Sequence, residues 1–80
     1  MKITVTQNDI DSGYQYSCEC CPVALAIRRD TGRKAIVGNF RVSFEDGSGF
    51  YDLPFDVSES IQHFDNGAQI DPFEFEMRPI

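Results

Sequence analysis

Three thiols at Cys18, Cys20 and Cys21 form the densest group of chemically reactive side chains in this chain. They directly precede Pro22, and proline is typical of the first position of a helix. The positive end of a helix dipole lowers the pKa of a nearby thiol. Cys18 and Cys21 also have the C-x-x-C spacing of a redox pair, although Pro22 lies outside the pair.

The same thiols, together with the only histidine, His63, are also the ligand types of a structural zinc site. Their spacing is poor for zinc, because the adjacent Cys20 and Cys21 do not easily bind one ion. The favoured interpretation is that Cys21 caps the helix and the other thiols stay free, with no metal and no cofactor. A metal-binding or thiol-redox regulatory protein that uses residues 18–21 is the alternative.

No group of residues has the spacing of a catalytic site. His63 lies four residues after Glu59 on a predicted helix, where we expect it to face solvent. One histidine does not supply a nucleophile with its base and orienting group. Glu74 and Glu76 share one face of a predicted strand, which is more typical of a solvated edge than of a general acid and base. We therefore predict no catalytic residues and no enzymatic activity.

Charge is distributed unevenly along the chain. Residues 1–44 carry six Lys or Arg against four acids, whereas residues 45–80 carry nine acids against Arg78 alone. Such an acidic segment repels nucleic acid and attracts basic surfaces. The predicted partner-binding residues are the acids on solvent faces of the second half: Asp56, Glu59, Asp65, Asp71, Glu74 and Glu76. They are expected to form one continuous negative surface.

The basic residues gather between Arg28 and Lys34. Such a cluster can hold phosphate or nucleic acid. The favoured interpretation is a solvated helix end, because arginines in a last helical turn suit its negative dipole. We therefore expect no direct contact with nucleic acid.

The first half of the chain must position these groups with one strand and one main helix. Alternation over residues 1–6 predicts a strand, and Thr6 with Asp9 resembles a capping box that opens a short helical turn over residues 8–12. A buried helix is predicted from Pro22 to its end at Gly32. Residues 35–44 are predicted to be extended, with a bulge or bend at Gly38-Asn39.

The second half predicts a hairpin turn over residues 45–49 and a return strand over residues 50–53. A second helix, capped by residues 56–59, carries an apolar stripe of Val57, Ile61 and Phe64 and ends near Gly67. The Phe residues of this half that lie among the acids are predicted to be mostly core: Phe55, Phe64, Phe73 and Phe75. A last strand over residues 73–78 has an acidic outer face.

The resulting order is β-α-β-β-α-β, which predicts an α+β fold, ferredoxin-like or a related antiparallel sheet with two helices on one face. Eighty residues fit a single domain over residues 1–80. The longest purely apolar run, residues 23–27, is far shorter than the roughly 20 residues that cross a bilayer. We expect a cytoplasmic protein.

Five segments together resemble a family of small uncharacterised proteins encoded by phages and prophages. The residues that carry the resemblance are Val5-Thr6-x-x-Asp9-Ile10-x-x-Gly13, Cys18-x-x-Cys21-Pro22-Val23-Ala24-Leu25-Ala26, Leu53-Pro54, Phe64-Asp65-x-Gly67 and Pro72-Phe73-x-Phe75. The family has no established activity, so the resemblance transfers no functional residues. It implies a setting in the cytoplasm of a bacterial host.

Small acidic phage proteins include inhibitors of host defence, among them anti-CRISPR proteins, and some of these mimic DNA with carboxylates. The expected function is therefore that of a phage-derived inhibitor. Its acidic half would block a basic, nucleic-acid-binding protein surface on a host defence complex.

Overall fold

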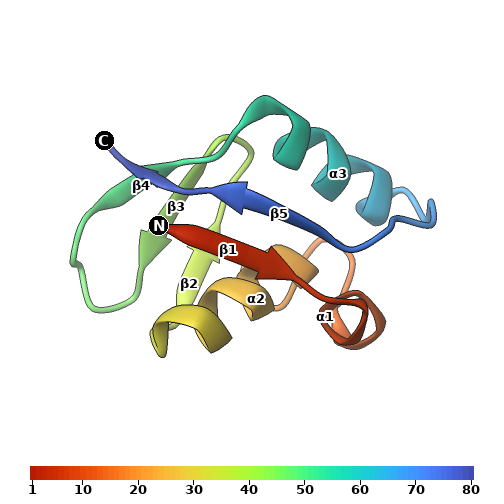
Figure 1. Ribbon diagram of the computed structural model, residues 1–80, viewed down its shortest axis with the longest axis horizontal. Coiled ribbons are helices and arrows are strands. Elements are labelled where there is room, and N and C mark those ends of the chain that lie inside the picture. The colour runs from red at the N-terminus through yellow and green to blue at the C-terminus, as the bar shows by residue number, and fades with distance from the viewer.

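The computed structural model describes residues 1–80 as three helices and six strands (Figure 1). The helices are α1 (Gln7–Ser12), α2 (Pro22–Thr31) and α3 (Phe55–Asp65). The strands are β1 (Lys2–Val5), β2 (Ala35–Val37), β3 (Arg41–Phe44), β4 (Phe50–Asp52), β5 (Phe73–Glu76) and β6 (Arg78–Pro79). The predicted α+β class is confirmed.

The strands form two antiparallel sheets rather than one. β1 pairs with β5, and the second sheet has the order β2-β3-β4-β6. Met77 lies between β5 and β6 and is fully buried, so the last segment of the chain joins both sheets. The antiparallel pairing agrees with the sequence prediction, but the strands do not share a single ferredoxin-like sheet.

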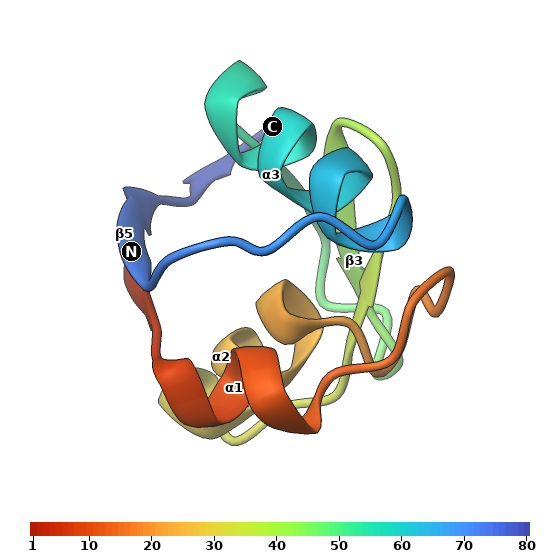
Figure 2. The same cartoon turned by 90° about the vertical axis from the view of Figure 1, so that its right-hand side faces the viewer.

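The helices lie on two sides of the molecule. α1 and α2 lie on one side and α3 lies on the other, as the two views show (Figures 1 and 2). The predicted placement of two helices on one face is therefore wrong. α1 is a third helix, because the capping box at its start is complete: the Thr6 and Asp9 side chains each accept from the other's backbone N–H.

The predicted extended segment over residues 35–44 is a hairpin. Gly38 N–H donates to the carbonyl oxygen of Arg41 (2.8 Å), and Val37 lies opposite Val42. The bend at Gly38-Asn39 thus reverses the chain completely. Phe40, which continued the alternation of a single strand, is instead 55% exposed in the turn.

The two long helices begin and end differently. α2 is capped by Cys21, whose Sγ accepts from Ala24 N–H (3.4 Å), and it ends at Gly32, which has a φ of 72°. Both boundaries confirm the prediction. α3 follows Pro54 and has no side-chain cap. The predicted cap over residues 56–59 is therefore wrong, because these residues already lie within the helix.

One hydrophobic core joins the sheets and helices. Its largest fully buried side chains include Ile3 of β1, Ile27 of α2, Val42 of β3 and Met77. α2 packs against both β1 and β2. None of the helices is long and apolar enough to span a membrane.

Candidate acidic interface

Ion pairs neutralise the acids over most of the molecule. Seven of the 13 acids pair with a cation: Asp9, Glu19, Asp30, Glu45, Asp46, Glu74 and Glu76. The basic cluster supplies most of these cations, because Arg29, Arg33 and Lys34 each contact at least one carboxylate. Its cations are thus largely engaged within the chain.

The six acids without an ion pair concentrate around α3. Two of them lie elsewhere, Asp11 on α1 and Asp52 on β4. The other four were all predicted to bind a partner: Asp56, Glu59 and Asp65 on α3, and Asp71 in the loop after it. The cations of the chain therefore leave uncompensated negative charge mainly at α3 and the loop that follows it.

Three of the six predicted carboxylates line one cavity. Asp56 from α3, Asp71 from the following loop and Glu74 from β5 surround a space of about 340 Å³. Glu59 lies one helical turn after Asp56, and residues three apart are neighbours on a helix surface. We call Asp56, Glu59, Asp71 and Glu74 the acidic cluster. All four side chains are exposed.

Asp56 also benefits from its place in the helix. It lies in the first turn of α3, and its Oδ1 accepts from Val57 N–H (3.0 Å). The positive end of the helix dipole stabilises a negative charge there. The carboxylate is thus held at the start of the helix.

The other two predicted carboxylates have structural partners. The Asp65 carboxylate accepts from Tyr16 N–H (2.9 Å), and Tyr16 has a φ of 56° that a side-chain-bearing residue rarely adopts. Glu76 contacts the N-terminal ammonium group at 2.8 Å, and this hydrogen bond and charge lower the pKa of its carboxyl. Neither Asp65 nor Glu76 lines the cavity that Asp56, Asp71 and Glu74 share, so both are left out of the acidic cluster, whereas Glu74 lines the cavity and also pairs with Lys2 (3.1 Å).

An exposed aromatic side chain next to Asp56 was missed in the sequence. Phe55, the first residue of α3, is 68% exposed, so its assignment to the core is wrong. It lies two residues before the buried Val57, which places it on a different side of the helix from the apolar stripe. That offset is the signal that could have identified it. The backbone of Phe40 lies beside the end of β4, two residues before Phe55, because its carbonyl oxygen accepts from Leu53 N–H (3.0 Å).

The thiols differ sharply in their environments. Cys18 is exposed, Cys20 is half-buried and Cys21 is buried. Burial raises the pKa of the Cys21 thiol, although hydrogen bonds from the helix backbone oppose this effect. His63 is exposed on α3, and no group of three or more His, Cys, Asp or Glu residues is arranged to hold a metal ion.

The acidic cluster can accept hydrogen bonds and attract cations. Lysine and arginine side chains are the protein groups that complement such a site. An exposed aromatic ring beside it adds the kind of residue that is enriched at protein interfaces. No family model, curated protein or solved structure matches this chain.

Proposed function

We propose that this protein binds a basic protein surface through the acidic cluster and thereby blocks a site for nucleic acid. The observation that carries the proposal is the concentration of carboxylates without cationic partners at α3 and the loop after it, namely Asp56, Glu59, Asp65 and Asp71. Unpaired charges attract oppositely charged partners and repel like-charged ones. A basic site that holds nucleic-acid phosphates has the complementary charge.

Phe55 supports a protein partner over a purely solvated face. Aromatic side chains often contribute most of the binding energy at interfaces, with charged groups around them. In this proposal Phe55 packs against the partner while Asp56 and Glu59 pair with its cations.

The resemblance to phage and prophage proteins directs the proposal to a host defence complex as the partner. The protein would then act in the host cytoplasm as an inhibitor of the anti-CRISPR type. Its carboxylates would occupy the channel or groove that otherwise holds nucleic acid. Neither catalysis nor a cofactor is required for this action.

The test compares two triple variants that change the net charge equally. D56N/E59Q/D71N removes charge from the acidic cluster, and D11N/E19Q/E45Q removes the same charge elsewhere. Binding of each variant to purified CRISPR effector complexes is measured at low and physiological salt. We expect the cluster variant to bind roughly tenfold or more weakly, with a reduced salt dependence, and the control to bind within about twofold of the wild type.

Two results would contradict the proposal. One is that the wild-type protein binds none of the effector complexes. The other is that both triple variants weaken binding equally, because net charge alone would then account for the attraction. F55A provides an independent check, since its loss of affinity should be insensitive to salt.

A further inference from the structure

The outer edge of β5 has main-chain groups without partners. Met1 and Met77 exchange two backbone hydrogen bonds, of 2.8 and 3.1 Å. Hydrogen-bonded and non-hydrogen-bonded pairs alternate along an antiparallel ladder, so the next bonded pair joins Ile3 to Phe75. The N–H and C=O groups of Glu74 and Glu76 therefore point away from β1. No strand pairs with β5 on that side.

The outer edge of β1 differs because side chains cover it. Thr4 N–H donates to the Asp30 carboxylate (3.0 Å), and the Thr4 carbonyl oxygen accepts from Arg29. Asp30 and Arg29 both belong to α2. Proteins commonly close an exposed strand edge in this manner. β5 lacks an equivalent cover, and its Glu74 and Glu76 main-chain groups form no hydrogen bond outside the ladder.

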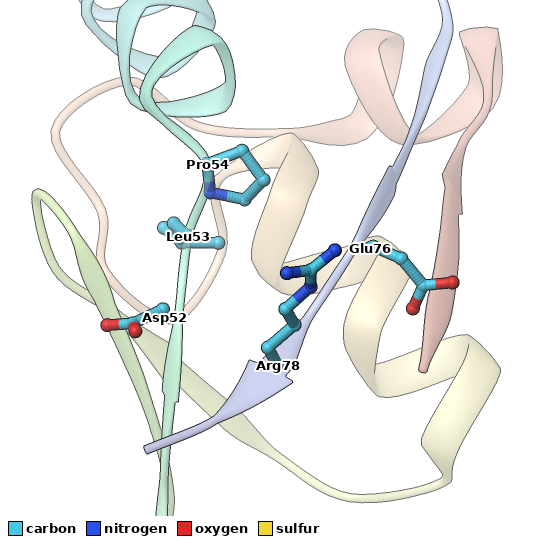
Figure 3. Close-up of a pocket in the computed structure, with 5 residues that line it drawn as sticks. All are labelled: Asp52, Leu53, Pro54, Glu76 and Arg78. Carbon is cyan, nitrogen blue, oxygen red and sulfur yellow. The ribbon is translucent and has the colours of Figure 1, made fainter.

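Open space lies along this edge. After Met77 the chain continues as β6, which pairs with β4. Before Met77, β5 does not pair with β4, and a cavity of about 310 Å³ lies between them. Leu53 and Pro54 form one wall, and Figure 3 shows the Arg78 side chain between the two strands. The Glu76 carboxylate is directed away from Leu53 and Pro54. The cavity of the acidic cluster lies between α3 and β5 and reaches Glu74 at the other end of this edge.

We propose that β5 binds an extended segment of the partner as an added strand. The segment would hydrogen-bond to the main chain of Glu74 and Glu76, which is the usual basis of strand addition. A lysine or arginine of the segment would point into the cavity lined by Asp56, Asp71 and Glu74, where the carboxylates of Asp56 and Asp71, which have no ion pair within the chain, complement its charge. The proposal rests on the proposed function, because the occupant is a basic segment of the same partner.

The length of the edge limits the number of bonds. Pro72 precedes β5 and has no N–H, so the available groups are those of Glu74 and Glu76. Strand addition gives affinity through the main chain, and alternate side chains give specificity. The acidic cluster is thus the specificity element, and the backbone of β5 is the docking element.

The test uses a synthetic eight-residue peptide of alternating lysine and threonine. A second peptide has the same sequence but N-methyl groups at alternate residues, which block its hydrogen bonds and keep its charge. We expect the plain peptide to protect the Glu74 and Glu76 amides from hydrogen exchange and to shift their NMR signals. The methylated peptide should bind about three- to tenfold more weakly, as the loss of a main-chain bond implies.

Two protein variants separate the backbone from the charge. E74Q removes the carboxylate, and E74P removes both the carboxylate and the outward N–H without touching the bonded pairs to β1. E74P should bind the plain peptide about three- to tenfold more weakly than E74Q. Amide spectra of the free variants establish that both retain the wild-type fold.

The outcomes distinguish this proposal from the proposed function. Equal binding of the two peptides, or absence of protection at Glu74 and Glu76, overturns strand addition. If D56N/E59Q/D71N still loses affinity for the effector complex in that case, the proposed function stands. If the effector complex does not bind the wild type while the peptide protects β5, strand addition stands and the proposed function fails.

Discussion

Asp9 illustrates how one buried acid holds two elements together. Its Oδ2 accepts from Thr6 N–H (2.9 Å) and contacts the Arg29 guanidinium at 2.6 Å, so it joins α1 to α2. Burial opposes its ionisation, but the hydrogen bonds from Arg29 and Thr6 and the charge of Arg29 outweigh that effect. The pKa of Asp9 is therefore lowered in the folded protein.

D9N should destabilise the fold by about 1–3 kcal/mol at pH 7, since it weakens a helix cap and leaves Arg29 without its buried partner. Urea denaturation measures the change. D11N is the control and should stay within about 0.5 kcal/mol of the wild type, because Asp11 is exposed and bonds only to Gln7.

The contribution of Asp9 should also depend on pH. An acid whose pKa is lowered by folding stabilises the fold above the unfolded pKa of about 3.9, and this stabilisation is lost as pH falls through the folded pKa. The gap between wild type and D9N should therefore narrow below about pH 4, and a constant gap would contradict the role of ionised Asp9.

The thiols should differ in their reactivity in the native protein. Cys18 is exposed and should be alkylated by iodoacetamide, whereas Cys21 is buried and has a raised pKa. Mass spectrometry of digested protein locates the modified thiols before and after unfolding in urea. Cys21 should be modified only after unfolding. Modification of Cys21 at the same rate as Cys18 in the native protein would show that its place as the cap of α2 is wrong.

Residue roles could be predicted where they depend on near neighbours in the sequence. Thr6 with Asp9, and Cys21 with Pro22, lie within one helical turn of their partners, so spacing alone identified these caps. The partner of Asp65, Tyr16, is 49 residues away in the sequence. Spacing does not reveal such a contact, so Asp65 was assigned to a binding surface. Contacts of that kind depend on how elements pack, and periodicity does not encode them.

Gly13 sets the packing of the connection between α1 and α2. A Cβ added there would lie 2.7 Å from Pro22 Cδ and 2.9 Å from Pro22 N. Because backbone atoms of Pro22 cannot move aside without shifting the start of α2, G13A should cost roughly 1–3 kcal/mol. Thermal or urea unfolding measures the loss. G38A is the control, since its nearest contact would be 3.4 Å from the Arg41 carbonyl oxygen; an equal loss in both variants would refute the steric explanation.

At the scale of elements, local signals predicted the helices better than the strands. Pro22 and Gly32 mark α2 at both ends, and each acts through its own backbone. The error over residues 35–44 arose because two antiparallel strands of a hairpin can keep the same alternation as one long strand. Gly38 was recognised as a bend, but the sharpness of the bend depends on the bond from its N–H to Arg41.

At the scale of the molecule, the sheet arrangement was beyond local periodicity. β1 pairs with β5 across almost the whole chain, and β5 continues into β6 in the other sheet. The acidic half was identified from composition, but composition does not reveal which acids are paired. Arg33 and Lys34, from the first half, neutralise Asp46 and Glu45, and so the unpaired acids that remain lie chiefly around α3.

The two sheets should unfold as one unit, because Met77 belongs to the core of both. M77A should cost about 2–5 kcal/mol, the usual range for truncating a buried methionine, whereas I80A should cost far less because Ile80 is 65% exposed. Amide signals of β1 and β3, followed by NMR through a urea titration, report the two sheets separately. Their midpoints should coincide in the wild type and fall together in M77A. If β3 kept its midpoint while β1 unfolded earlier, the two sheets would unfold independently, and the role of Met77 in joining them would be wrong.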